Sequence, residues 1–80
     1  MADIIAELRK LGKKNPQLLL EKLEKMELTS LEFIILKSRY IDRLFFKQIP
    51  EVIGKSESWM YKVHKQAIKK IDNNIIWLIC

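Results

Sequence analysis

The chain has little of several residue types, and each scarcity excludes a class of protein. It holds one cysteine, Cys80, so no disulfide can form within the chain, which suits a reducing, cytoplasmic setting. It holds one histidine, His64, and one residue of each kind cannot assemble a zinc site or a histidine-based catalytic set. The longest apolar run, residues 75–80, is far shorter than the roughly 20 residues of a membrane span. We therefore expect a cytoplasmic protein that is not an enzyme and has no metal, cofactor or membrane segment.

Strand patterns are also scarce. No segment alternates apolar and polar residues cleanly, and residues that favour helices dominate. The apolar fraction of 49% is enough for a small hydrophobic core. The sequence therefore predicts a single all-α domain over residues 1–80.

Residues that begin or end helices divide this domain into five predicted helices. Their spans are 3–11, 16–26, 30–40, 46–53 and 57–72. Asp3 and the Asn15-Pro16 pair are typical helix starts, and Gly12 is placed to end the first helix. The first two helices form an N-terminal pair over residues 1–27.

The other three helices lie in residues 28–72. The third begins at a capping box, in which the side chains of Thr29 and Glu32 each accept a hydrogen bond from the other's backbone N–H. Gly54 can end the fourth helix in the left-handed conformation, and Ser56 can cap the fifth. Two helices joined by three or four residues that include a glycine have the spacing of a helix-turn-helix.

Two features complicate the third and fourth helices. A proline inside a helix destabilises it by about 3 kcal/mol, but a proline in the first turn is tolerated. Pro50 therefore gives the fourth helix an alternative start near Ile49. Leu31, Phe33 and Ile34 make the third helix apolar nearly all round, which predicts burial on more than one side. The N-terminal helices, the apolar tail or a partner could cover it. The tail spans residues 73–80 and includes Trp77, and we expect it to pack on the N-terminal helices or to contact a partner.

The fifth helix has one apolar side and one basic side. We expect residues on facing sides of three helices to be buried together, namely Leu36, Ile49, Ile53, Met60, Val63 and Ala67. The opposite side of the fifth helix carries Ser58, Lys62, Lys65 and Lys69. Residues 42–72 hold seven basic and four acidic residues, a net charge of +3 out of +5 for the chain. This pattern favours a polyanionic partner, and the alternative is a solvated surface that keeps the protein in solution.

Two residues beside the basic side have two readings each. His64 lies at the edge of the apolar side, where a structural role is favoured over a phosphate contact. Trp59 flanks the basic side, where it can pack on the fourth helix or rest on a sugar-phosphate backbone.

Three stretches, LTSLEFIILKSRY, FFKQIPEVIGKS and YKVHKQAIKKI, resemble region four of the sigma-70 family of transcription factors. The arrangement is also similar to small phage regulators of the ArpU type. The matching positions are Leu28, Thr29, Glu32, Ile35, Leu36, Arg39, Tyr40, Phe46, Ile49, Glu51, Ile53, Gly54, Ser56, Val63, His64, Ala67 and Ile68. The resemblance covers residues 28–72, over half of the chain. It implies a DNA-binding transcription regulator whose fifth helix enters the major groove of duplex DNA. The similarity to the phage regulators implies that a phage is one possible source.

The resemblance also implies which residues contact DNA. By position, the base-reading residues are Glu57, Ser58, Tyr61 and Lys62. The phosphate contacts fall on Arg43, Lys47, Lys55 and Lys65, to which the helical spacing adds Lys69. A second hypothesis stays open, in which the domain is a protein-interaction module that binds RNA polymerase or another regulator without reading DNA. A homodimer through the third helix or the tail is a further alternative.

Overall fold

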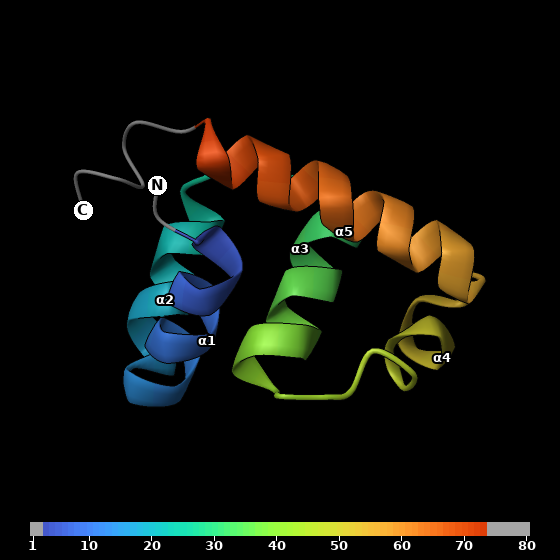
Figure 1. Cartoon of the computed structure of the whole chain (residues 1–80), viewed down its shortest axis with the longest axis horizontal. Helices are drawn as coiled ribbons and strands as arrows, with labels where there is room; N and C mark the ends of the chain where they lie inside the picture. Colours follow the sequence, from blue (N-terminus) through green and yellow to red (C-terminus); the bar gives the residue numbers. More distant parts are fainter. Residues whose placement is uncertain (1–2, 74–80) are drawn as a thin grey trace.

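The computed structural model describes residues 3–73, which fold into five α-helices and one π-helical turn (Figure 1). The elements are α1 (Ile4–Lys14), α2 (Pro16–Glu24), α3 (Ser30–Leu36), η1 (Lys37–Ile41), α4 (Ile49–Ile53) and α5 (Glu57–Asp72). No strand occurs within these residues, so the predicted all-α class is confirmed. Except for Asn73, the predicted apolar tail, with Trp77 and Cys80, lies outside the described residues.

The helices begin at the positions that their capping residues predicted. Backbone N–H groups two or three residues further on donate to three of these caps: Ile5 to Asp3 at 3.1 Å, Leu18 to Asn15 at 3.2 Å and Trp59 to Ser56 at 3.2 Å. Gly54 ends α4 in the left-handed conformation, with φ 64° and ψ 32°. Because each of these signals acts over a few residues, it needs no tertiary contact to be effective.

The prediction for Gly12 is wrong. Helix α1 continues through Gly12 to Lys14, and Asn15 both ends α1 and caps α2. Gly12 is buried, and a Cβ atom at this position would collide with the backbone carbonyl oxygen of Tyr40. Glycine is therefore required here because α1 passes very close to the backbone of η1, not because a helix ends.

Three predicted boundaries also need correction. The third predicted helix changes at Lys37 into η1, where the Asp42 N–H donates to the Lys37 carbonyl at 2.9 Å, a bond across five residues. Helix α4 begins at Ile49 rather than at residue 46, since Pro50 lacks an N–H and fits only the first turn. Helix α2 ends at Glu24, two residues early.

The hydrophobic core has two parts. The first joins α1, α2, α3 with η1, and α5, and consists of Ile4, Leu8, Leu19, Leu23, Leu36, Tyr40, Ala67 and Ile71. The second joins α3, α4 and α5, and consists of Ile35, Ile49, Met60 and Val63. The predicted single cluster is thus wrong, because Leu36 and Ala67 face the N-terminal helices and Ile53 is only partly buried. Ile35 and Leu36 lie in different parts, so the third helix is buried on two sides. Of the residues on which this prediction rested, however, Leu31 and Phe33 are only partly buried and Ile34 is exposed.

Helix α5 lies across α1, α2, α3 and α4 along one side of the molecule (Figure 1). His64 fixes it to η1, since its Nε2 lies 2.8 Å from the hydroxyl oxygen of Tyr40. The ring of Phe46 meets the imidazole edge-on, with 5.1 Å between the centroids. Burial, and then the nearby charge of Arg39, lower the pKa of His64. His64 therefore has the structural role that the sequence favoured.

Gly12→Ala tests the close approach of α1 to η1. Intrinsic helix propensity alone would make this change stabilising by about 1 kcal/mol. We expect instead that the collision with Tyr40 lowers the free energy of unfolding by about 1–3 kcal/mol, measured by urea denaturation. Lys13→Ala, at an exposed neighbouring position, is the control and should change stability little. A Gly12→Ala protein more stable than the parent would contradict the packing described.

Candidate functional site

The outward side of α5 is the strongest candidate site. Met60, Val63, Ala67 and Ile71 bury one side of the helix, and the opposite side is exposed. That exposed side carries Ser58, Lys62, Lys65 and Lys69, which we call the α5 basic face. Within residues 3–73 none of its three lysines has an ion-pair partner. Their charges are therefore available to an anionic ligand.

An aromatic side chain flanks the α5 basic face on one edge. Trp59 is exposed, with Lys62 Nζ 5.7 Å and Lys55 Nζ 6.0 Å from the centroid of its ring. These are cation–π distances, and they hold both ammonium groups beside the same ring. Lys55, which lies in the connection between α4 and α5, is thereby placed next to the face.

A second aromatic group flanks the opposite edge. The ring of Tyr61 packs on that of Phe46, with 5.3 Å between the centroids, and Tyr61 is 44% exposed. Phe45, Phe46, Lys47, Gln48 and Tyr61 line a shallow hollow there. Gln48 Oε1 accepts the N–H of Phe45 at 2.9 Å and so holds the turn in place. Lys47 is thereby brought to the edge of α5 that carries Tyr61.

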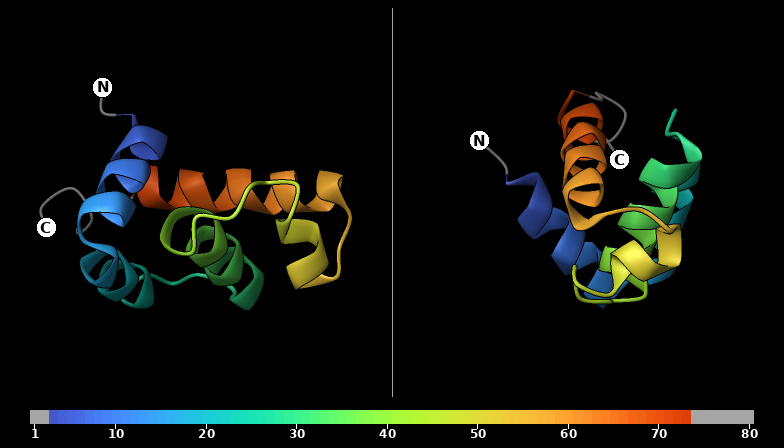
Figure 2. Two further views of the ribbon diagram at one scale, coloured as in Figure 1. Left: turned by 90° about the horizontal axis from the view of Figure 1, so that it is seen from below. Right: turned by 90° about the vertical axis from the view of Figure 1, so that its right-hand side faces the viewer.

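The structure places the predicted site residues in two groups. All of them are exposed. Those in α5, with Lys47 and Lys55 at its edges, lie together, and Glu57 stands in the first turn of the helix. Arg43 belongs instead to the segment that links η1 to α4, which begins on the side of the molecule opposite α5 (Figure 1 and Figure 2, right).

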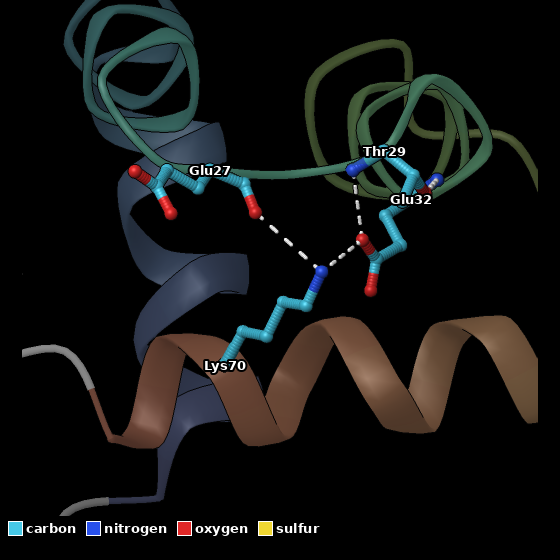
Figure 3. A network of polar contacts seen from close by, with 4 residues as sticks. All are labelled: Glu27, Thr29, Glu32 and Lys70. Carbon is cyan, nitrogen blue, oxygen red and sulfur yellow. Dashed lines mark hydrogen bonds and ion pairs between the residues drawn. The ribbon is translucent and has the colours of Figure 1, made fainter.

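The rotation of α5 is set by a polar network that sequence reasoning missed (Figure 3). Glu32 is 2% exposed, and its Oε1 accepts the Thr29 N–H at 2.8 Å and Lys70 Nζ at 2.7 Å. Lys70 Nζ also donates to the carbonyl oxygen of Glu27 at 3.5 Å. The capping box was predicted, but the third partner comes from α5, 38 residues further on. No local pattern indicates such a pair.

This network removes one lysine from the candidate site. Lys70 points to the start of α3, away from the α5 basic face (Figure 3). Burial alone would raise the pKa of the Glu32 carboxyl, but the hydrogen bonds from Lys70 and Thr29 outweigh it and hold this pKa below its ordinary value. The ionised carboxylate is thus the form that the fold stabilises.

No metal centre or membrane helix competes with this site in the described part of the chain. Within residues 3–73 no three His, Cys, Asp or Glu side chains come together as ligands. No helix among them has the length and apolar character needed to cross a bilayer.

Glu32→Gln tests the ionised network. Because its folded-state pKa is lowered, the Glu32 carboxylate stabilises the fold above pH 4.5 and loses this effect as the pH falls further. We expect Glu32→Gln to lower the free energy of unfolding by about 1 kcal/mol at neutral pH. This difference from the parent should become smaller below pH 4.5. Urea denaturation at several pH values measures both. Glu24→Gln, an exposed change in α2, controls for the loss of one negative charge. A difference in the free energy of unfolding that does not vary with pH would show that the charge of Glu32 does not stabilise the fold.

Comparison of the chain with protein-family models, with curated proteins and with solved structures finds no match. The candidate site therefore has to be interpreted from its own geometry.

Proposed function

We propose that the protein is a DNA-binding transcription regulator that places the α5 basic face in the major groove of duplex DNA. The observation that carries the proposal is the row of three unpaired lysines, Lys62, Lys65 and Lys69, on the one side of α5 that the core leaves exposed. Lysines that meet phosphates release condensed counterions, which is the main source of affinity for DNA. The resemblance to sigma region four supports the same assignment.

The shape of the molecule supports entry into a groove. The major groove is about 12 Å wide and admits one α-helix. Helix α5 lies along the outside of the molecule, and α1 to α4 lie on its other side (Figure 1). Helix α4 and the three-residue connection Gly54-Lys55-Ser56 precede it, which is the order and spacing of a helix-turn-helix. We propose that α4 and α5 form this motif in the manner of sigma region four.

The residues of α5 divide by their position along the helix. The N-terminal residues of a recognition helix meet base edges, so Glu57, Ser58, Tyr61 and Lys62 are the proposed base readers. A carboxylate can accept a hydrogen bond from the amino group of cytosine, and a lysine can donate to guanine. The phosphate contacts come from Lys65 and Lys69 along the helix and from Lys47 and Lys55 at its edges.

The alternative function is a protein-interaction module that binds RNA polymerase or another regulator. Phe45, which is 72% exposed, lines one hollow with Phe46 and Tyr61, and apolar side chains gathered on a surface favour a protein partner. Only DNA binding depends on the lysines of the α5 basic face. Their substitution therefore separates the two functions in the experiment below.

The two sets of α5 residues should respond differently to substitution. Lys65→Ala and Lys69→Ala should each weaken binding to every duplex and reduce the slope of log K against log salt by about one. Ser58→Ala, Tyr61→Phe and Lys62→Ala should cost about 1–3 kcal/mol on a duplex selected for tight binding and little on random duplexes. Fluorescence anisotropy at several salt concentrations measures both effects.

The control for this series is Lys25→Ala, which removes an exposed lysine at the end of α2 and should leave the slope unchanged. If all the α5 variants bind every duplex as the parent does, the groove model is wrong. Retention of RNA polymerase by the parent and by these variants, with no DNA binding, would establish the alternative.

A further inference from the structure

Arg39 of η1 is a half-buried cationic residue outside the α5 basic face. Its Nε atom is buried and has no hydrogen-bond partner among residues 3–73. In the same part of the chain no carboxylate forms an ion pair with its guanidinium. A buried donor without an acceptor costs free energy, so the other contacts of Arg39 must compensate for this cost.

Two contacts join Arg39 to the segment that links η1 to α4. Its Nη1 donates to the carbonyl oxygen of Leu44 at 3.0 Å. The Cζ atom of its guanidinium lies 4.6 Å from the centroid of the Phe46 ring, which is a cation–π distance. One planar group thus holds both the backbone and an aromatic side chain of this segment. A lysine, whose charge is a compact ammonium, does not reproduce such a stacked arrangement.

The ring of Phe46 connects this segment to α5. It meets the imidazole of His64 at an interplanar angle of 86° and the ring of Tyr61 with 5.3 Å between the centroids. His64 is itself fixed, since its Nε2 lies 2.8 Å from the hydroxyl oxygen of Tyr40. The Phe46 ring is therefore held by Arg39 of η1 and by two residues of α5.

Tyr61 depends on Phe46 for its orientation. Tyr61 is exposed, and it packs on the Phe46 ring in the shallow hollow at the edge of α5. An exposed aromatic side chain without such a neighbour can move between rotamers. A side chain that is already held in its binding conformation loses less conformational entropy when a ligand binds. The contacts from Arg39 to Phe46 and from Phe46 to Tyr61 therefore link η1 to a proposed base reader.

We propose that Arg39 is a positioning residue for base recognition, which holds Tyr61, through the ring of Phe46, in the conformation that reads a base. The inference rests on the proposed function, in which Tyr61 meets base edges. Arg39 does not itself contact the DNA, because its guanidinium is engaged by Leu44 and Phe46. Loss of its contacts should therefore reduce the preference for one DNA sequence and leave the sequence-independent affinity unchanged.

A comparison of two duplexes tests this role. Fluorescence anisotropy gives the dissociation constants for a duplex selected for tight binding and for a random duplex, and their ratio measures the preference. Arg39→Lys keeps the charge and removes the planar guanidinium, and Phe46→Leu keeps an apolar side chain and removes the ring. Ile4→Val, a buried change in α1, is the control for a general loss of stability. Urea denaturation gives the free energy of unfolding of each variant.

We expect Arg39→Lys and Phe46→Leu each to lower the preference at least about fivefold, and to change binding of the random duplex by no more than about twofold. Tyr61→Ala should lower the preference at least as much. Addition of Arg39→Lys to Tyr61→Ala should lower it further by no more than about twofold, because both changes remove the same base contact. Ile4→Val should leave the preference unchanged.

Several results would overturn the inference. An unchanged preference in Arg39→Lys or in Phe46→Leu, with the preference lost in Tyr61→Ala, would do so and would leave the proposed function intact. Losses that multiply in the double variant would show that Arg39 acts independently of Tyr61. Equal losses on the random and the selected duplex would assign Arg39 to a direct phosphate contact, and an equal loss in Ile4→Val would assign the effect to stability. A parent that binds no duplex would contradict both proposals.

Discussion

The buried carboxylate of Glu32 is the constraint on which the geometry of the candidate site depends. A charge removed from water is tolerated only when other groups solvate it, and here the backbone N–H of Thr29 and the ammonium of Lys70 do so. The first turn of α3 must therefore lie beside the C-terminal part of α5 (Figure 3). With Lys70 held at this point and Met60 buried at the other end, α5 cannot rotate about its axis. The orientation of its outward lysines follows from this.

The division of the core has a consequence for binding. Helix α5 contributes to both parts, so the N-terminal helices hold its second half and α4 holds its first half. Tyr40 joins the parts, since its backbone meets α1 and its hydroxyl meets His64 of α5. A helix supported along its whole length presents its side chains in one arrangement. Little conformational entropy is then lost in the backbone when a ligand binds.

The success of sequence reasoning depended on the distance over which each signal acts. The caps at Asp3, Asn15 and Ser56 and the capping box were predictable, because each involves residues that are close in the chain. The bounds and the buried side of α5 followed from its own periodicity. Gly12 was misread because its reason is a contact with Tyr40, in another helix. The Glu32–Lys70 pair also depends on tertiary placement, which no local pattern encodes.

The most direct test of the account is to locate the DNA contact on the protein. A short duplex is titrated at low salt into the isotope-labelled protein, and the backbone amide resonances are followed by nuclear magnetic resonance. We predict that at the lowest DNA ratios the largest shifts fall in residues 55–69, with those of Lys47 beside them, and that added salt reverses them. Shifts that are largest in α2, or the absence of shifts at any DNA ratio, would contradict the assignment of α5 as the DNA-binding helix.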